Sequence, residues 1–200
     1  ESASAAAVPE ILKKAINAGK DIMVMSVGGL VADEDLIGLA KKSGSTLYIP
    51  SGAICGLDGV KAAAMKGIEE AILTTRKPPK GLKDAPYINK KAIDLDSLKS
   101  DKVIFDGTAQ EAVREFPKNI NVSAVLSLAG IGAKKTRVRI ICSPGQKSNI
   151  HEIEVKGEFG KLTARTENVP SPNNPKTSFL AALSAIATLK GIVENIKIGT

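Results

Sequence analysis

Aromatic side chains are scarce in this sequence of 200 residues: tryptophan is absent, and aromatic residues make up only 3%. Proteins that bind single-stranded nucleic acid stack bases on aromatic rings, so this scarcity argues against that class. The net charge of +7 would suit a nucleic-acid partner, but the lysines are scattered along the whole chain. We therefore expect no nucleic-acid partner and favour a local group of cations that binds a small anion.

Cysteines, long apolar runs and a targeting segment are also scarce or absent. Cys55 and Cys142 are the two cysteines; they stand in no metal or redox spacing, which suggests a reducing compartment. Cys55, in a glycine-rich stretch, is expected to be a small buried thiol. No apolar stretch approaches the ~18 residues that span a bilayer, and no signal peptide is recognisable. The sequence thus predicts a cytoplasmic protein with no membrane partner and no metal.

The first part of the chain has the pattern of parallel α/β units. Two short and nearly continuous apolar runs, residues 21–26 and 46–49, predict strands that are buried on both faces. A helix that begins near Val8 precedes the first strand, and a helix at residues 33–42 lies between the two. This order predicts adjacent parallel strands. Gly28 and Gly29, after the first strand, are interpreted as a turn.

The rest of the chain changes to an α+β pattern with a mostly antiparallel sheet and helices on one face. Strands are predicted at residues 68–75, 102–106, 137–141, 150–155 and 161–166. Helices are predicted at residues 57 onward, 108–116, 121–128 and 177–195. Thr108 and Glu111 have the spacing of a capping box, and the segment 77–83 is interpreted as a surface loop. An α/β half joined to an α+β half suits a nucleotide-binding unit attached to a catalytic unit.

His151 is the single histidine of the chain. Strand alternation places it on the same side as Ile153 and Val155, while Glu152 and Glu154 lie on the other side. One interpretation is a core or rim histidine with a structural role only. The other is an acid or base at the end of a sheet, where an imidazole titrates near neutral pH.

Three further segments carry candidate binding residues. The loop 50–56 follows a strand and contains Ser51, Gly52 and Ala53, at the sheet edge where ligands bind in open α/β folds. Residues 174–178 precede the last helix, whose free N–H groups could bind a carboxylate. Residues 116–122 form a polar junction between two helices. Each segment taken alone is also compatible with an ordinary turn or helix cap.

These segments occur together in an order that resembles the L-aspartate dehydrogenase family of archaea and bacteria. The resemblance covers nearly all of the chain. It is carried by residues 1–4, 51–58, 74–77, 116–122, 149–151 and 174–178.

The resemblance implies a two-domain, NAD- or NADP-dependent enzyme that oxidises L-aspartate to iminoaspartate, for NAD biosynthesis or for hydrolysis to oxaloacetate and ammonia. It implies a homodimer, and it divides the chain into a remainder of a Rossmann domain (1–56), an α+β substrate and dimerisation domain (57–184), and a tail (185–200) that returns toward the Rossmann half. His151 matches the family's active-site histidine, and Ala53 and Asn121 match cofactor-contacting positions. To the cofactor set we add Gly28, Ser51 and Gly52. Physical reasoning assigns the substrate to Lys118, Asn119, Asn149, Lys176 and Thr177, because a dicarboxylate needs cations and hydrogen-bond donors.

The sequence departs from the family in two respects: no Gly-x-Gly-x-x-Gly turn precedes Glu1, and Cys55 stands where the family usually has glycine. We therefore expect the 200-residue chain to hold a dinucleotide weakly. Two alternatives remain open. The first is a related enzyme, such as a homoserine dehydrogenase or dihydrodipicolinate reductase relative. The second is a non-catalytic binding domain.

Overall fold

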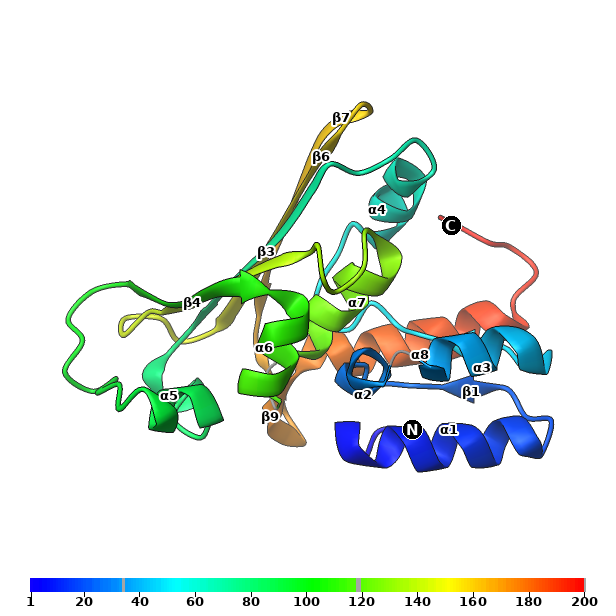
Figure 1. Ribbon diagram of the computed structural model, residues 1–200, viewed down its shortest axis with the longest axis horizontal. Helices are drawn as coiled ribbons and strands as arrows, with labels where there is room; N and C mark the ends of the chain where they lie inside the picture. The colour runs from blue at the N-terminus through cyan, green and yellow to red at the C-terminus, as the bar shows by residue number, and fades with distance from the viewer. Residues whose placement is uncertain (34, 118–119, 200) are drawn as a thin grey trace.

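The computed structural model describes residues 1–33, 35–117 and 120–199. The α/β part lies at one end of the molecule, and a larger sheet extends away from it (Figure 1). The elements of the α/β part are η1 (Ala5–Ala7), α1 (Val8–Asn17), β1 (Ile22–Met23), α2 (Gly28–Ala32), α3 (Asp35–Ser43) and β2 (Leu47–Tyr48). Strands β1 and β2 pair in parallel, with Ile22 opposite Leu47, so the prediction of adjacent parallel strands is confirmed.

The predicted turn at Gly28 and Gly29 is wrong, because these residues form the first turn of α2. Neither residue has a positive φ. A Cβ atom on Gly29 would lie 2.4 Å from the backbone oxygen of Ala5 and 2.7 Å from Cβ of Val8. Gly29 is therefore needed for the close approach of α2 to η1 and α1.

The second part is a five-stranded sheet in the order β4-β5-β3-β6-β7. Its strands are β3 (Glu70–Lys77), β4 (Lys102–Thr108), β5 (Arg137–Cys142), β6 (Asn149–Gly157) and β7 (Gly160–Asn168). All neighbouring pairs are antiparallel except β3 and β5. Helices α4 (Leu57–Ala64), α6 (Ala109–Glu115) and α7 (Asn121–Ala129) lie on one side of this sheet (Figure 1). The α/β class with a mostly antiparallel second sheet is thus confirmed.

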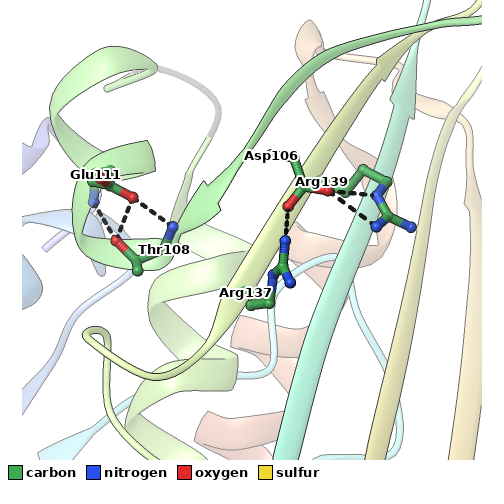
Figure 2. Close-up of polar contacts among 5 residues, drawn as sticks. All are labelled: Asp106, Thr108, Glu111, Arg137 and Arg139. Carbon is green, nitrogen blue, oxygen red and sulfur yellow. Dashed lines mark hydrogen bonds and ion pairs between the residues drawn. The ribbon is translucent and has the colours of Figure 1, made fainter.

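The other face of the sheet carries cross-strand ion pairs. Asp106 on β4 binds Arg137 at 2.6 Å and Arg139 at 3.0 Å, both on β5 (Figure 2). The hydrogen bond from Arg137, followed by that from Arg139, lowers the pKa of Asp106. On the buried face, alternating apolar residues such as Leu73, Val138 and Ile153 build the core.

Helix α6 begins as the sequence predicts. Thr108 Oγ1 accepts a hydrogen bond from Glu111 N at 3.2 Å, and Glu111 Oε2 accepts one from Thr108 N at 2.7 Å (Figure 2). This reciprocal capping box satisfies two backbone donors that the first turn of a helix leaves without intrahelical partners. Tyr87, Phe105 and Phe116 form a cluster of rings nearby, with centroids 5.3–5.5 Å apart.

The segment between β3 and β4 is more ordered than a plain loop. It contains η2 (Pro79–Gly81) and α5 (Pro86–Lys90). Lys77, assigned from the sequence to a surface loop, is instead the last residue of β3 and is only 8% exposed. Alternation along β3 places it on the buried face with Leu73 and Thr75.

The C-terminal segment also departs from the prediction. The last helix, α8 (Phe179–Val193), begins two residues later than expected. Thr177 belongs instead to β9 (Asn174–Ser178), which pairs with β8 (Pro170–Ser171). Ser178 is the N-cap residue but makes no side-chain cap hydrogen bond. Across the residues that the structure describes, no helix has the length and apolar character needed to cross a membrane.

Candidate functional site

His151 lies near the start of β6, directly opposite Thr75 of β3. Its Nδ1 is 3.0 Å from Thr75 Oγ1, and the residue is 5% exposed. Ile153 and Val155 are buried on the same face, while Glu152 and Glu154 are partly exposed. The predicted orientation of His151 toward the interior is therefore confirmed.

The environment of His151 differs from the expected one. Burial, followed by the positive charge of Lys77, lowers the pKa of His151 to about 3. The ring is therefore neutral at physiological pH in the free protein, rather than half protonated as the sequence suggested. A neutral imidazole whose Nδ1 is engaged by a hydroxyl presents Nε2 to a ligand, as a donor or an acceptor according to its tautomer.

Lys77 is the residue of this site that sequence reasoning missed. It pairs with Cys142 of β5 and lies two positions beyond Thr75 on the same face of β3. Burial lowers the pKa of Lys77 to about 8. The buried alternation of Leu73 and Thr75 could have been extended to Lys77, but the two prolines that follow it favoured a loop.

The loop after β2 is anchored next to His151. Thr166 on β7 lies opposite His151. Its Oγ1 donates a hydrogen bond to the backbone oxygen of Ala53 at 2.8 Å, and Asn168 Nδ2 donates to the same oxygen at 3.0 Å. The fold therefore brings one predicted cofactor residue, Ala53, to the strand that neighbours the predicted catalytic residue.

The neighbours of Ala53 are held by a different element. Gly52 N donates a hydrogen bond to Ser184 Oγ of α8 at 3.0 Å, and Gly52 has a φ of +66° that favours glycine. Ser51 is partly buried beside it. Cys55 in the same loop is exposed, so the expectation of a buried thiol is wrong. The loop turns this side chain outward while Ala53 and Ile54 face the core.

Two other predicted cofactor residues are in direct contact. Gly28 N, in the first turn of α2, donates a hydrogen bond to Asn121 Oδ1 at 3.0 Å. Asn121 is the first residue of α7 and is exposed. This contact joins the end of the β1 unit to the helix that covers the larger sheet, across 93 positions of the sequence.

The structure describes the side chains of only some of the predicted substrate residues. Asn149 lies opposite Asn168 at the start of β6, two residues from His151. Thr177 is exposed on β9. Lys118, Asn119 and the side chain of Lys176 lie outside what the structure describes. Over the described chain, no group of three or more His, Cys, Asp or Glu residues could hold a metal ion.

One buried oxygen of the site could accept a hydrogen bond from the amide group of a nicotinamide. Asn168 Oδ1 is buried and has no hydrogen-bond partner among the described residues, although Nδ2 of the same side chain is bound to Ala53. A buried acceptor without a donor costs free energy that a ligand N–H group would recover. This observation concerns only the nicotinamide end of such a cofactor.

The fold and the site thus define a nucleotide-binding α/β segment joined to an α+β segment that carries a buried histidine. Comparisons with known proteins agree with that class. Residues 58–192 match the family model "Aspartate dehydrogenase, C-terminal", and residues 1–50 match "Homoserine dehydrogenase, NAD binding domain". The chain belongs to the aspartate dehydrogenase family.

Individual relatives give the same result. An L-aspartate dehydrogenase of Methanosarcina mazei is 54% identical over all of this chain and 75% of its own length. One from Nitrosopumilus maritimus is 47% identical with the same coverage. The crystal structure of aspartate dehydrogenase from Thermotoga maritima aligns with a TM-score of 0.79 at 28% identity, covering 98% of this chain and 76% of that one.

Proposed function

We propose that this chain carries the catalytic part of an NAD- or NADP-dependent oxidation of L-aspartate to iminoaspartate. The imine then supplies NAD biosynthesis or hydrolyses to oxaloacetate and ammonia. One observation carries the proposal: Thr166 lies opposite His151 and donates a hydrogen bond to the backbone oxygen of Ala53. The candidate base therefore lies next to the loop that follows the parallel strands. Membership of the aspartate dehydrogenase family supports the choice of substrate.

The bound cofactor would supply the hydride acceptor, held by Ala53, Gly28 and Asn121 with Ser51 and Gly52. The chain's own residues would prepare the substrate. His151 would accept a proton from the substrate amine at Nε2 and later activate the water that hydrolyses the imine. Thr75 would hold the ring in place through Nδ1. Asn149, Lys118, Asn119, Lys176 and Thr177 remain the proposed contacts for the rest of the substrate.

We also propose how the protein is organised. The chain divides into residues 1–56, 57–184 and 185–200, and the middle segment forms a homodimer. The proposed location is the cytoplasm. The hydrogen bond between Gly52 and Ser184 supports a last helix that returns to the first segment.

The test is a pair of proteins: the 200-residue chain, and the same chain preceded by the N-terminal quarter of the Methanosarcina mazei relative. The chain spans 75% of that relative, and we infer from the NAD-binding match at residues 1–50 that the remaining quarter is N-terminal. The extended protein should reduce NAD or NADP when L-aspartate is added. The short chain should bind NAD weakly in calorimetry, because its sequence holds no glycine-rich turn. Lack of aspartate-dependent reduction in a folded extended protein would refute the proposal.

A second candidate has one observation in its favour: the match of residues 1–50 to the NAD-binding domain of homoserine dehydrogenase. The extended protein should therefore also be assayed with L-homoserine. The aspartate dehydrogenase match over residues 58–192, which contain His151, favours aspartate. Turnover of homoserine in preference to aspartate would reverse that choice.

A further inference from the structure

Lys77 is a buried cation that the proposed reaction does not yet use. Its side chain shares the face of β3 with Thr75, which lies opposite His151. Gly81 of η2 packs along it: a Cβ atom on Gly81 would lie 3.7 Å from both Cβ and Cδ of Lys77. Lys77 and His151 are 8% and 5% exposed. The fold thus places an ammonium group and an imidazole close together on neighbouring strands.

An ammonium group loses its hydration when it is buried, which disfavours its charged form. Burial is the cause that lowers the pKa of Lys77 to about 8, and the charge of Lys77 helps to keep His151 neutral. Of the other titratable groups around Lys77, Cys142 on β5 has a thiol whose pKa burial raises. Lys80, in the segment that packs on Lys77, is exposed.

Such a pair suits one kind of ligand. A carboxylate beside the ammonium group would form a charge-assisted hydrogen bond with it. A substrate carboxylate would also offset the charge of Lys77 at the neighbouring imidazole and so favour transfer of a proton from the substrate amine to that ring. A dicarboxylic amino acid offers both groups on one small molecule.

We propose that the Lys77 ammonium group binds one carboxylate of the substrate and thereby makes the site selective for a dicarboxylic amino acid next to His151. This inference rests on the proposed function and names a residue that determines specificity. It predicts that binding requires protonated Lys77, so the affinity should fall when the pH rises above the range in which that amine is charged.

The probe is succinate, a four-carbon dicarboxylate that has no amine and is fully ionised above about pH 6.5. Its binding is measured by calorimetry between about pH 6.5 and about pH 9.5, which brackets the pKa of about 8 of Lys77. NMR of the imidazole gives a second readout. Because the chain has one histidine, that signal reports the site alone. The measurements use the 200-residue chain and the extended protein described above.

Three variants separate the possible roles. Lys77→Met should weaken succinate binding by roughly 10- to 100-fold and abolish its alkaline decline. Lys77→Arg keeps a positive charge at every pH tested. Its affinity for succinate should stay within about tenfold of the parent's and should not decline at alkaline pH. Lys80→Met, at an exposed lysine of the same segment, should behave as the parent does. Thermal melts of each variant establish that it is folded.

The inference is overturned if folded Lys77→Met binds succinate as the parent does, which would make Lys77 structural only. It is overturned equally if the parent binds no succinate, or binds it better as the pH rises, which would indicate a neutral amine acting as a base. These results leave the proposed function standing, because that is decided separately by aspartate-dependent reduction of the cofactor in the extended protein.

Discussion

Thr75 Oγ1 and His151 Nδ1 lie 3.0 Å apart across β3 and β6, and both residues are at most 5% exposed. The register of the two strands therefore fixes one nitrogen of the ring and leaves the other for a ligand. Because both residues belong to paired strands, the sheet holds the imidazole in its orientation, and a sheet is more rigid than a loop.

The Thr75 hydroxyl is expected to matter for turnover more than for binding. Thr75→Val keeps the shape of the side chain but removes the hydrogen bond, so the ring loses its fixed orientation. We expect kcat for aspartate to fall by about tenfold in the extended protein, while the KM for NAD changes little. Thr75→Ser should recover most of the loss. Equal kcat values for the valine and serine variants would contradict this role.

Burial of Lys77 should appear in the pH dependence of stability. The pKa of Lys77 is about 8 in the folded protein, against 10.5 for a lysine in water. Between these values the unfolded chain binds more protons, so Lys77 makes stability rise with pH over that window. Its charge is destabilising below the window. Lys77→Met should thus be more stable than the parent near pH 7, and the difference should shrink toward pH 10.5.

Thermal melts of the two proteins at matched pH and salt measure that difference directly. Exposed lysines such as Lys14 and Lys156 have pKa values that ion pairs raise, and they are present in both proteins. Their effects therefore cancel in the comparison. A difference that stays constant from neutral to alkaline pH would show that Lys77 is not desolvated as its burial implies.

The capping box of α6 should have a measurable effect on stability. Thr108→Ala removes the hydroxyl that accepts from Glu111 N (Figure 2). We expect a loss of about 1 kcal/mol in the free energy of unfolding, the usual cost of losing such a cap. Thr108→Ser keeps an accepting hydroxyl and should lose much less. Chemical denaturation of the three proteins measures both values, and an unaffected alanine variant would contradict the assignment.

Local patterns predicted much of the fold. The alternation of His151, Ile153 and Val155 predicted the strand and its buried face, and Thr108 with Glu111 predicted the start of α6. These signals are short in range, because each depends on residues within a few positions of one another. The parallel pairing of β1 and β2 also followed from the local order of the elements.

The errors arose where distant segments decide the structure. Gly28 and Gly29 belong to α2, where Gly28 lies against Ile120 and Asn121 of a distant segment and Gly29 allows the close approach of η1 and α1. Thr177 joins a strand because β8 provides the partner. Lys77 is buried because β3 continues beside β5 up to that residue. The contact of Asn121 with Gly28 joins positions 93 residues apart, which no local pattern contains.

His151 gives the decisive prediction for the chemistry. The oxidation of aspartate removes a hydride from the α-carbon while the amine becomes an imine, so the amine must lose a proton. Within the described residues, the imidazole is opposite Thr75 on one side and Thr166 on the other, and Thr166 holds Ala53. It is neutral in the free protein, because burial and Lys77 lower its pKa to about 3. It can therefore take the proton only when a substrate carboxylate offsets the charge of Lys77, since a nearby negative charge raises the pKa of an imidazole.

We therefore expect His151→Ala in the extended protein to lower kcat by ~10²-fold or more, the usual contribution of a general base. The affinity for NAD should change little, because the ring serves the substrate. Steady-state kinetics with L-aspartate and calorimetry with NAD measure the two effects. A thermal melt and the exposed control Lys80→Met exclude a general loss of structure. If a well-folded alanine variant turned over at nearly the parent rate, His151 would be a buried structural histidine, and the base would have to be sought elsewhere in the site.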